Sequence, residues 1–230
     1  MLEYGPHLYQ KKGFARNPFQ ELSERELLAL FPPGGELLTL IEGGDPQPLQ
    51  LVGPEGSGKS SALLQIRRYF LQKGVEVMYF HIDHEGEALS GQSILEVPVL
   101  LIDEAWRLVP QNLEELLAPR LSRSLFTAFS SHGDLGPVLK MPLSTWSTEQ
   151  GALSRTGELF AVLVEAFRER HERHELSEGG KEALLRCAAG NLRTWRAHLY
   201  EIFTWDPIPP VIEACHAATA HAALWGEKPA

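Results

Sequence analysis

Residues 53–60 match the pattern Gly-x-x-x-x-Gly-Lys-Ser, which is typical of a phosphate-binding loop. Glycines let successive backbone N–H groups point at one phosphate, and the start of a helix adds positive potential. Lys59 would place a charge near the β- and γ-phosphates, and the Ser60 hydroxyl would be a ligand of Mg²⁺. We therefore predict that ATP with Mg²⁺ binds at Gly53, Pro54, Glu55, Gly56, Ser57, Gly58, Lys59, Ser60 and Ser61.

The alternative is a glycine-rich turn that contains a Lys-Ser pair by chance. The context argues against it, because the loop follows an apolar run at 49–52 and precedes a helical pattern at 59–73. Leu63 and Ile66 share one face of that helix, and Gly74 follows as a stop signal. A strand, a loop and a helix in this order are what phosphate binding requires.

A second apolar run, at 97–102, ends in Asp103 and Glu104. A parallel strand delivers the residues at its carboxyl end to the ligand crevice. Asp103 would hold Mg²⁺ through a water, and Glu104 would orient or deprotonate the water that attacks the γ-phosphate. Acidic residues also end strands because that end is solvated, but the position downstream of a phosphate loop favours a Walker B motif.

Polar residues also follow the apolar run at 125–130. Ser131 is our candidate for a side chain beside the γ-phosphate, with Ser130 and His132 as alternatives. A hydroxyl or an imidazole there could donate a hydrogen bond to a phosphate oxygen. Short polar residues also simply terminate strands, which is the competing interpretation.

The elements that must position these residues indicate an α/β fold. Apolar runs alternate with helical stretches, which is typical of a parallel sheet. The predicted strands are 49–52, 75–82, 97–102, 125–130 and, more weakly, 138–141. After residue 141 the pattern is helical, with helices at 157–174, 178–189, 191–204 and 211–225. We predict a five-stranded parallel sheet flanked by helices, followed by a small C-terminal helical lid.

This pattern divides the chain into three parts. A lead-in spans residues 1–48, with helices at 23–31 and 37–42 that glycines and prolines separate. The phosphate-loop core spans 49–144, and the helical lid with its tail spans 145–230.

The run Gly190-Asn191-Leu192-Arg193 resembles the second sensor motif of AAA+ ATPases, in which an arginine that opens a lid helix reaches the γ-phosphate. The resemblance implies this role for Arg193. Arg193 lies off the apolar face set by Trp195 and Leu199, and Asn191 is a good N-cap. A solvated arginine on an amphipathic helix is the alternative.

Two shorter motifs extend the resemblance. Residues 103–108 are similar to the Asp-Glu-Ala-x-Arg-Leu motif of bacterial AAA+ proteins of the secretion and transposition type. Asn17, Pro18 and Phe19 resemble the lead-in of the same group, where the backbone and the ring cover the adenine, although Phe19 could equally be a core residue. The resemblance implies ATP hydrolysis and a protein partner that is remodelled, loaded or regulated.

The chain departs from the AAA+ pattern where an arginine finger is usual. Between Arg123 and Arg155 it has no arginine, and Lys140 is the only basic residue apart from histidine. The pattern also lacks a helix before the fifth strand, because residues 132–136 lead almost directly into the next predicted strand. A finger would therefore come from another segment or from a partner, and homo-oligomer formation is left open.

The composition of the chain limits its partners and its cellular location. Thirty acidic against 21 basic residues give a net charge of −9, which disfavours nucleic-acid binding over a broad surface and leaves DNA binding to a local patch. The two cysteines lack metal-ligand spacing and support no disulfide framework, so we expect a cytoplasmic protein. We see no signal peptide and no membrane-spanning stretch.

Three further classes of site are disfavoured. Residues 88–92 resemble the signature loop of ABC transporter ATPases, but too few residues separate Gln92 from Asp103 for that fold. No Asn-Lys-x-Asp motif indicates guanine recognition. His171 and His174 lie on a charged helix, and no carboxylate or cysteine completes a metal set with them.

Two functional classes remain. In the first, the protein turns over ATP to act on a partner; in the second, it is a nucleotide-dependent switch or adaptor that hydrolyses ATP very slowly. The Asp103–Glu104 pair favours the first class, and the missing arginine finger favours the second.

Overall fold

The computed structural model describes residues 9, 12–20, 23, 25–26, 35–43, 47–148, 152–168, 173–189 and 191–226. The chain forms two compact units. One is Leu27–Thr148, and the other joins Met1–Glu26 to Glu149–Ala230. Within the described residues, every helix is too short or too polar to cross a bilayer.

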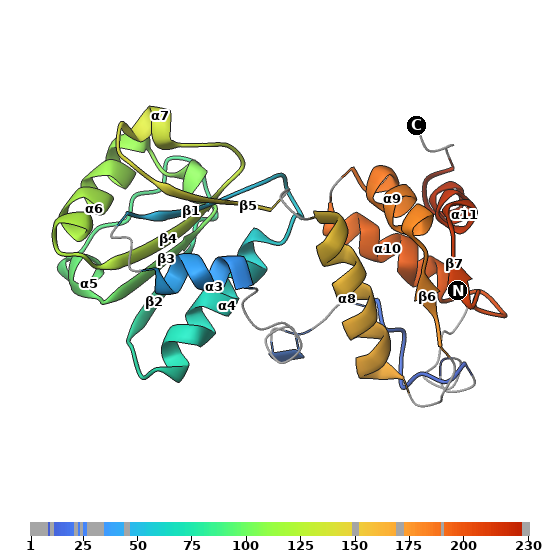
Figure 1. The fold of residues 1–230 in the computed structure, drawn as a ribbon. Coiled ribbons are helices and arrows are strands. Elements are labelled where there is room, and N and C mark those ends of the chain that lie inside the picture. The colour runs from blue at the N-terminus through green and yellow to red at the C-terminus, as the bar shows by residue number, and fades with distance from the viewer. Residues whose placement is uncertain are drawn as a thin grey trace. The chain divides into compact units, whose positions relative to one another are not determined.

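The first unit is built on a five-stranded sheet in which each pair of neighbouring strands is parallel (Figure 1). The order in the sheet is β2-β3-β4-β1-β5. The strands are β1 (Leu49–Val52), β2 (Val77–His81), β3 (Val99–Asp103), β4 (Phe126–Ser131) and β5 (Ser144–Ser147). The predicted five-stranded parallel sheet is confirmed.

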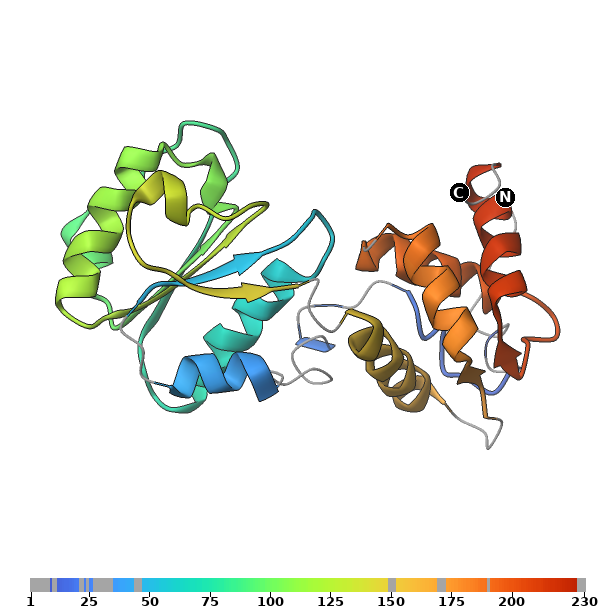
Figure 2. The same ribbon diagram turned by 45° about the horizontal axis from the view of Figure 1, so that its top comes forward.

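Helices cover both faces of this sheet (Figure 2). One face packs on α3 (Gly35–Glu42) and α4 (Lys59–Gln72), and the other on α5 (Gln92–Glu96), α6 (Pro110–Ser122) and α7 (Gly136–Leu139). In β3, Leu100 and Ile102 face the second group, whereas Val99 and Leu101 face the first. β3 is therefore apolar up to Asp103, its last residue, and is buried on both sides.

The strand register gathers the candidate residues at one edge of the sheet. Val52 at the end of β1 pairs with Ser131 of β4, and His81 at the end of β2 pairs with Asp103 of β3. All of these strands run in the same direction, so their carboxyl ends meet there.

The predicted strand at 138–141 is wrong. Val138 and Leu139 belong to α7, which has a proline in its first turn, and Leu139 packs in the core. The fifth strand is β5, which comes next along the chain. It pairs only with β1, at the edge of the sheet, and its sequence Ser-Thr-Trp-Ser lacks the apolar run that marks a buried strand.

The second unit is mainly helical, but strands do not disappear after residue 141 as predicted. Besides β5, a short parallel pair forms from β6 (Glu175–Leu176) and β7 (Val211–Ile212). The helices are α8 (Ala152–Phe167), α9 (Glu178–Cys187), α10 (Leu192–Ile202) and α11 (Ala214–Trp225). Most of the predicted helix at 23–31, residues 169–172 and Gly190 lie outside the described residues.

The N-terminal segment belongs to the helical unit, which differs from the predicted lead-in of residues 1–48. The Lys12 ammonium group donates to the carbonyls of Phe203, Thr204 and Trp205, directly after the C-terminus of α10, where a positive charge is favourable. The Phe14 and Phe19 rings pack edge-on against Phe203. These contacts join segments that are far apart in the sequence, which no local pattern reveals.

Arg120 of α6 is fully buried and holds several elements of the sheet unit together. Its guanidinium donates to Thr127 Oγ1 (2.8 Å) and to three backbone carbonyls. These carbonyls belong to Ile94, Val97 and Phe126. Burial lowers the pKa of Arg120 to about 10, so the side chain stays charged at neutral pH.

We predict that Arg120→Met lowers the free energy of unfolding by about 3 kcal/mol, because it leaves buried carbonyls without a donor. Urea denaturation measures this. Arg123→Met is the matched control, since Arg123 is exposed and makes one long contact of 3.4 Å with Leu95 O. Equal stability of the two variants would contradict a structural role for Arg120.

Candidate nucleotide-binding site

The loop between β1 and α4 has a backbone that glycine alone adopts easily. Gly56 and Gly58 have φ angles of 71° and 98°, in the left-handed region, and Gly58 is the N-cap of α4. A Cβ on Gly53 would lie 1.7 Å from Thr148 Oγ1. The three glycines of the motif are thus required by conformation or by space.

Lys59, the first residue of α4, is 4% exposed and directs its ammonium group into this loop. Nζ donates to Gly53 O and Pro54 O, each at 2.8 Å. Burial lowers the pKa of Lys59, and the carboxylates of Glu104, Asp103 and Glu55 partly oppose this shift. A phosphate oxygen would be a stronger acceptor for this cation than a neutral carbonyl.

The hydroxyl of Ser57 gives an independent indication of a ligand. It is buried, and Oγ has no hydrogen-bond partner within the described structure. A buried hydroxyl without a partner is costly, so such groups usually meet an acceptor. A phosphate oxygen cradled by the loop would supply one, which shows that the residues present fit a phosphate.

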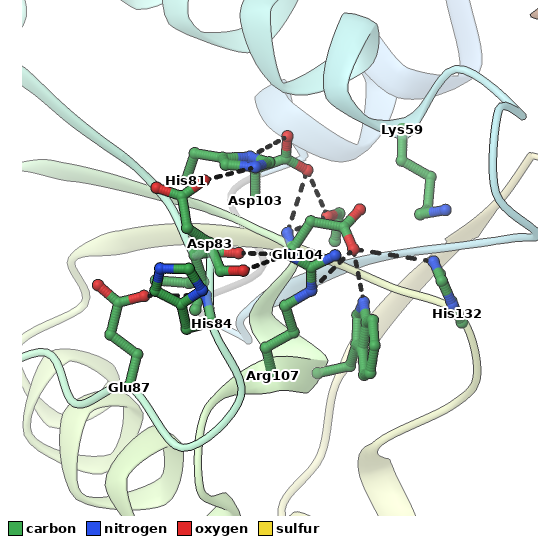
Figure 3. A network of polar contacts seen from close by, with 12 residues as sticks. Lys59, His81, Asp83, His84, Glu87, Asp103, Glu104, Arg107 and His132 are labelled. Atoms are coloured by element: carbon green, nitrogen blue, oxygen red, sulfur yellow. Dashed lines mark hydrogen bonds and ion pairs between the residues drawn. The ribbon is translucent and has the colours of Figure 1, made fainter.

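Asp103 lies at the centre of a polar network at the end of β3 (Figure 3). Its Oδ1 accepts from Ser130 Oγ (2.6 Å) and from the Glu104 backbone N–H (3.1 Å). Burial by itself raises the pKa of Asp103, but hydrogen bonds from its neighbours outweigh burial and hold its pKa below the ordinary value. These donors are Ser130, Ser60, His81 and Tyr79.

Ser60 is among the neighbours that lower the pKa of Asp103, which indicates that the two predicted metal ligands lie near each other. A hydroxyl and a carboxylate offer the hard oxygen donors that Mg²⁺ prefers, and Mg²⁺ keeps several of its waters in such sites. Ser60 is exposed, so an ion could reach it. The donor set therefore fits Mg²⁺.

Glu104 has a left-handed backbone (φ 59°), which is uncommon for a residue with a side chain. Its carboxylate is 17% exposed. Oε2 accepts from Trp106 Nε1 at 2.7 Å and lies 3.8 Å from both Arg107 Nε and His132 Nε2 (Figure 3). The Trp106 ring also stacks on His132. The left-handed turn thus aims the Glu104 carboxylate at Trp106, Arg107 and His132, of which Trp106 donates a hydrogen bond to it.

The end of β4 contributes differently from what we predicted for Ser131. Its hydroxyl donates to Gly133 O at 2.8 Å, and its carbonyl accepts from Gly53 N–H at 3.3 Å. The two alternatives contact the carboxylates, Ser130 at Asp103 and His132 at Glu104. A direct role of Ser131 toward a phosphate stays a prediction.

Sequence reasoning missed Tyr79, His81 and Trp106 as parts of this site. Tyr79 OH and His81 Nδ1 both contact Asp103 Oδ2, at 3.1 and 3.2 Å. Tyr79 and His81 are two residues apart in β2, so their side chains point to the same face. Two side chains with polar ends at that spacing near the end of a strand could have indicated a place in the site. The sequence gives no comparable indication for Trp106.

Arg193 lies in the first turn of α10 and is exposed. The Asn191 side chain caps this helix, because Oδ1 accepts from the Arg193 N–H (2.9 Å) and the Thr194 N–H (3.1 Å). The predicted N-cap is confirmed. Arg193 belongs to the helical unit, so its action on a phosphate in the other unit stays a prediction.

Asn17, Pro18 and Phe19 are all buried within the helical unit. Asn17 Oδ1 accepts from the Phe19 N–H at 2.9 Å. The Phe19 ring packs on Phe160 and Trp195, as the core alternative expected. A contact of this segment with adenine stays a prediction.

Neither a protein-family model nor a curated protein matches this chain. Solved structures do. A variant of RuvB from Thermotoga maritima superimposes with a TM-score of 0.53 at 15% identity, covering 90% of this chain and 73% of that one. Domain III of the replication initiation protein DnaA, also from Thermotoga maritima, gives 0.50 at 17% identity, covering 84% and 94%.

Both proteins are AAA+ ATPases, and at such low identity their likeness to this chain concerns the fold. The finer resemblance to the secretion and transposition type stays a prediction. The five parallel strands, the flanking helices and these two neighbours show that the chain has the α/β fold of a P-loop NTPase.

Proposed function

We propose that this chain is a Mg²⁺-dependent, AAA+-like ATPase that remodels, loads or regulates a protein partner. One observation carries the proposal: the phosphate-binding loop holds the buried ammonium group of Lys59 beside a buried Ser57 hydroxyl that has no hydrogen-bond partner within the described residues. A bound phosphate would satisfy both groups. A glycine-rich turn without a ligand would gain nothing from burying them.

Each residue at the sheet edge has a separate task in this proposal. Backbone N–H groups of the loop and Lys59 bind the phosphates, and Ser60 and Asp103 hold the metal. Mg²⁺, when bound, would neutralise charge on the transferred phosphoryl group. Ser130 fixes the orientation of the Asp103 carboxylate through its 2.6 Å hydrogen bond.

Glu104 is the proposed general base. It follows Asp103 directly, and its carboxylate lies at the same sheet edge as the loop. To act, it would accept a proton from the attacking water, so one oxygen must face the phosphate. Water attack suits this arrangement better than transfer to a substrate hydroxyl.

A nucleotide-dependent switch with very slow hydrolysis is the second candidate. The contacts of Glu104 favour it, because Trp106 already donates to Oε2 and two cationic or potentially cationic side chains lie nearby. A carboxylate oxygen held in this way must leave Trp106 before it can accept a proton from a water. A partner that moved Trp106 would then control hydrolysis.

The partner is proposed to be a protein. The net charge of −9 gives no support for broad contact with DNA. The structural neighbour RuvB is described as a Holliday junction branch migration motor, which leaves DNA as the alternative partner. The segment before β5 carries only the four-residue helix α7, so an arginine finger would come from elsewhere.

Lys59→Ala should abolish ATP binding and leave the fold intact, because the ammonium group faces the loop and not the apolar core. Calorimetric titration with ATP and Mg²⁺ measures the affinity. Lys73→Ala, at the exposed end of the same helix, is the matched control. Binding by Lys59→Ala within about threefold of the parent chain, a change well below 1.4 kcal/mol, would refute the loop assignment.

Glu104→Gln should keep ATP binding and slow turnover by about a hundredfold, the scale for loss of a positioned base. Phosphate release under saturating ATP gives the rate. Trp106→Phe is the control, because it removes the indole donor without touching the carboxylate, and its hydrolysis should be at least as fast as that of the parent. An unchanged rate in Glu104→Gln would remove Glu104 from the mechanism.

Arg193→Ala should weaken the preference for ATP over ADP by about 1 to 3 kcal/mol, the usual scale of coupling between two states. A guanidinium contacts phosphate through two parallel hydrogen bonds, which Arg193→Lys would not restore. Parallel titrations with ADP and a non-hydrolysable ATP analogue measure the effect, with Arg196→Ala as the control on the same helix. Equal losses for both nucleotides would mean that Arg193 only supports its helix.

A further inference from the structure

Three side chains of types that can bind metals lie close together in the helical unit, far from the phosphate-binding loop in sequence. They are Cys187 at the end of α9, His198 of α10 and His221 of α11. One ligand atom from each lies within 4.8 Å of the other two. Across the parts of the chain that the structure describes, no other three cysteine, histidine or acidic side chains come together in this way.

The hydrogen bonds of His198 prepare it as a ligand. Its Nδ1 lies 2.8 Å from the Thr194 carbonyl, which can only accept, so Nδ1 carries the proton. In a neutral imidazole the lone pair is then on Nε2. Metal-binding histidines commonly have this arrangement, in which a backbone carbonyl fixes the ring and the tautomer.

His221 faces this lone pair. Its Nδ1 is 3.0 Å from His198 Nε2, and the two rings are nearly parallel (9°). His221 Nδ1 must therefore be the donor in this hydrogen bond. The Trp225 ring lies 4.8 and 5.3 Å from the two imidazoles, centroid to centroid, and covers them. The Trp225 ring thus helps to fix the orientation of the two imidazole rings.

We propose that Cys187, His198 and His221 form a Zn²⁺ site. One thiolate and two imidazoles are a donor set typical of zinc. With ordinary zinc–ligand lengths, a tetrahedral site needs neighbouring donors about 3.3 to 3.6 Å apart. The 3.0 Å pair must open slightly, and the other separations, which lie within 4.8 Å, must match the same range. His198 is buried while Cys187 and His221 are half-buried, so a water can complete the fourth position.

Zinc binding would displace two protons, one from the Cys187 thiol and one from His221 Nδ1. The Cys187 thiol loses its proton to solvent as the zinc–sulfur bond forms. The Nδ1 proton of His221 is also displaced, and the ring takes up a proton at Nε2 to remain neutral. Both nitrogens that now share a hydrogen would then direct lone pairs at the metal.

The site would connect α9, α10 and α11, which pack on one another in this unit. The metal would therefore stabilise the unit whose helix α10 carries Arg193 in its first turn. Sequence spacing conceals the site, because its ligands lie on three separate helices and not in one short motif. This inference does not depend on ATP binding.

The test is a zinc titration of the full-length, reduced chain in excess Mg²⁺, with a competing chelator dye. One Zn²⁺ per chain should bind, and the melting temperature of the helical unit should rise by about 10 to 20 °C at 100-fold excess over the dissociation constant. Co²⁺ in place of Zn²⁺ should give the near-ultraviolet band of a cobalt–thiolate bond. Cu⁺ is titrated in parallel under anaerobic conditions.

Cys187→Ser and His221→Gln should each weaken zinc binding by about a hundredfold or more. Cys215→Ser is the matched control, because Cys215 is exposed on α11 and lies outside the cluster; it should bind like the parent. Both positions are half-buried, and melting without metal checks that the variants fold. Absence of stoichiometric binding, equal losses in all three variants, no cobalt–thiolate band, or binding of Cu⁺ but not Zn²⁺ would overturn the proposal.

Discussion

The geometry of the candidate nucleotide site depends on one buried carboxylate, that of Asp103. Removing a charged carboxylate from water is costly, and here four side-chain donors compensate for it so well that its pKa falls below the ordinary value. The donors come from β2, β4 and the first turn of α4. To place these donors around the carboxylate, β2 and β4 must end, and α4 must begin, close to the end of β3. The parallel register of the sheet brings the strand ends together.

The same constraint separates the two carboxylates at the end of β3. Asp103 is the last residue of an apolar strand and is fixed by its neighbours, whereas Glu104 turns away through a left-handed backbone into contact with Trp106. Two adjacent acidic residues thus have different surroundings and different proposed tasks. In the proposal Asp103 holds the metal, and Glu104 can move independently of it, which both the enzyme and the switch hypotheses need.

The sequence predicted what is local and missed what joins distant segments. The loop at 53–60 and the strand that ends at Asp103 were found because each motif is continuous, and a glycine, a lysine or an apolar run has a direct physical meaning there. Tyr79 and the three ligands of the proposed zinc site come from separate elements, so only packing brings them together. β5 was not predicted because an edge strand needs no apolar run. The N-terminal segment was not predicted to belong to the helical unit, because the contact of Lys12 with the end of α10 joins residues far apart in the sequence.

The most direct test of the central claim is a crystal structure of the chain with Mg²⁺ and a non-hydrolysable ATP analogue. We expect the β-phosphate within hydrogen-bond distance of the backbone N–H groups of residues 56–60, and Lys59 Nζ moved from Gly53 O and Pro54 O to phosphate oxygens. The metal should contact Ser60 Oγ and reach Asp103 through a water. A nucleotide bound elsewhere, or a loop that stays empty at a saturating concentration with Lys59 still on both carbonyls, would contradict the account.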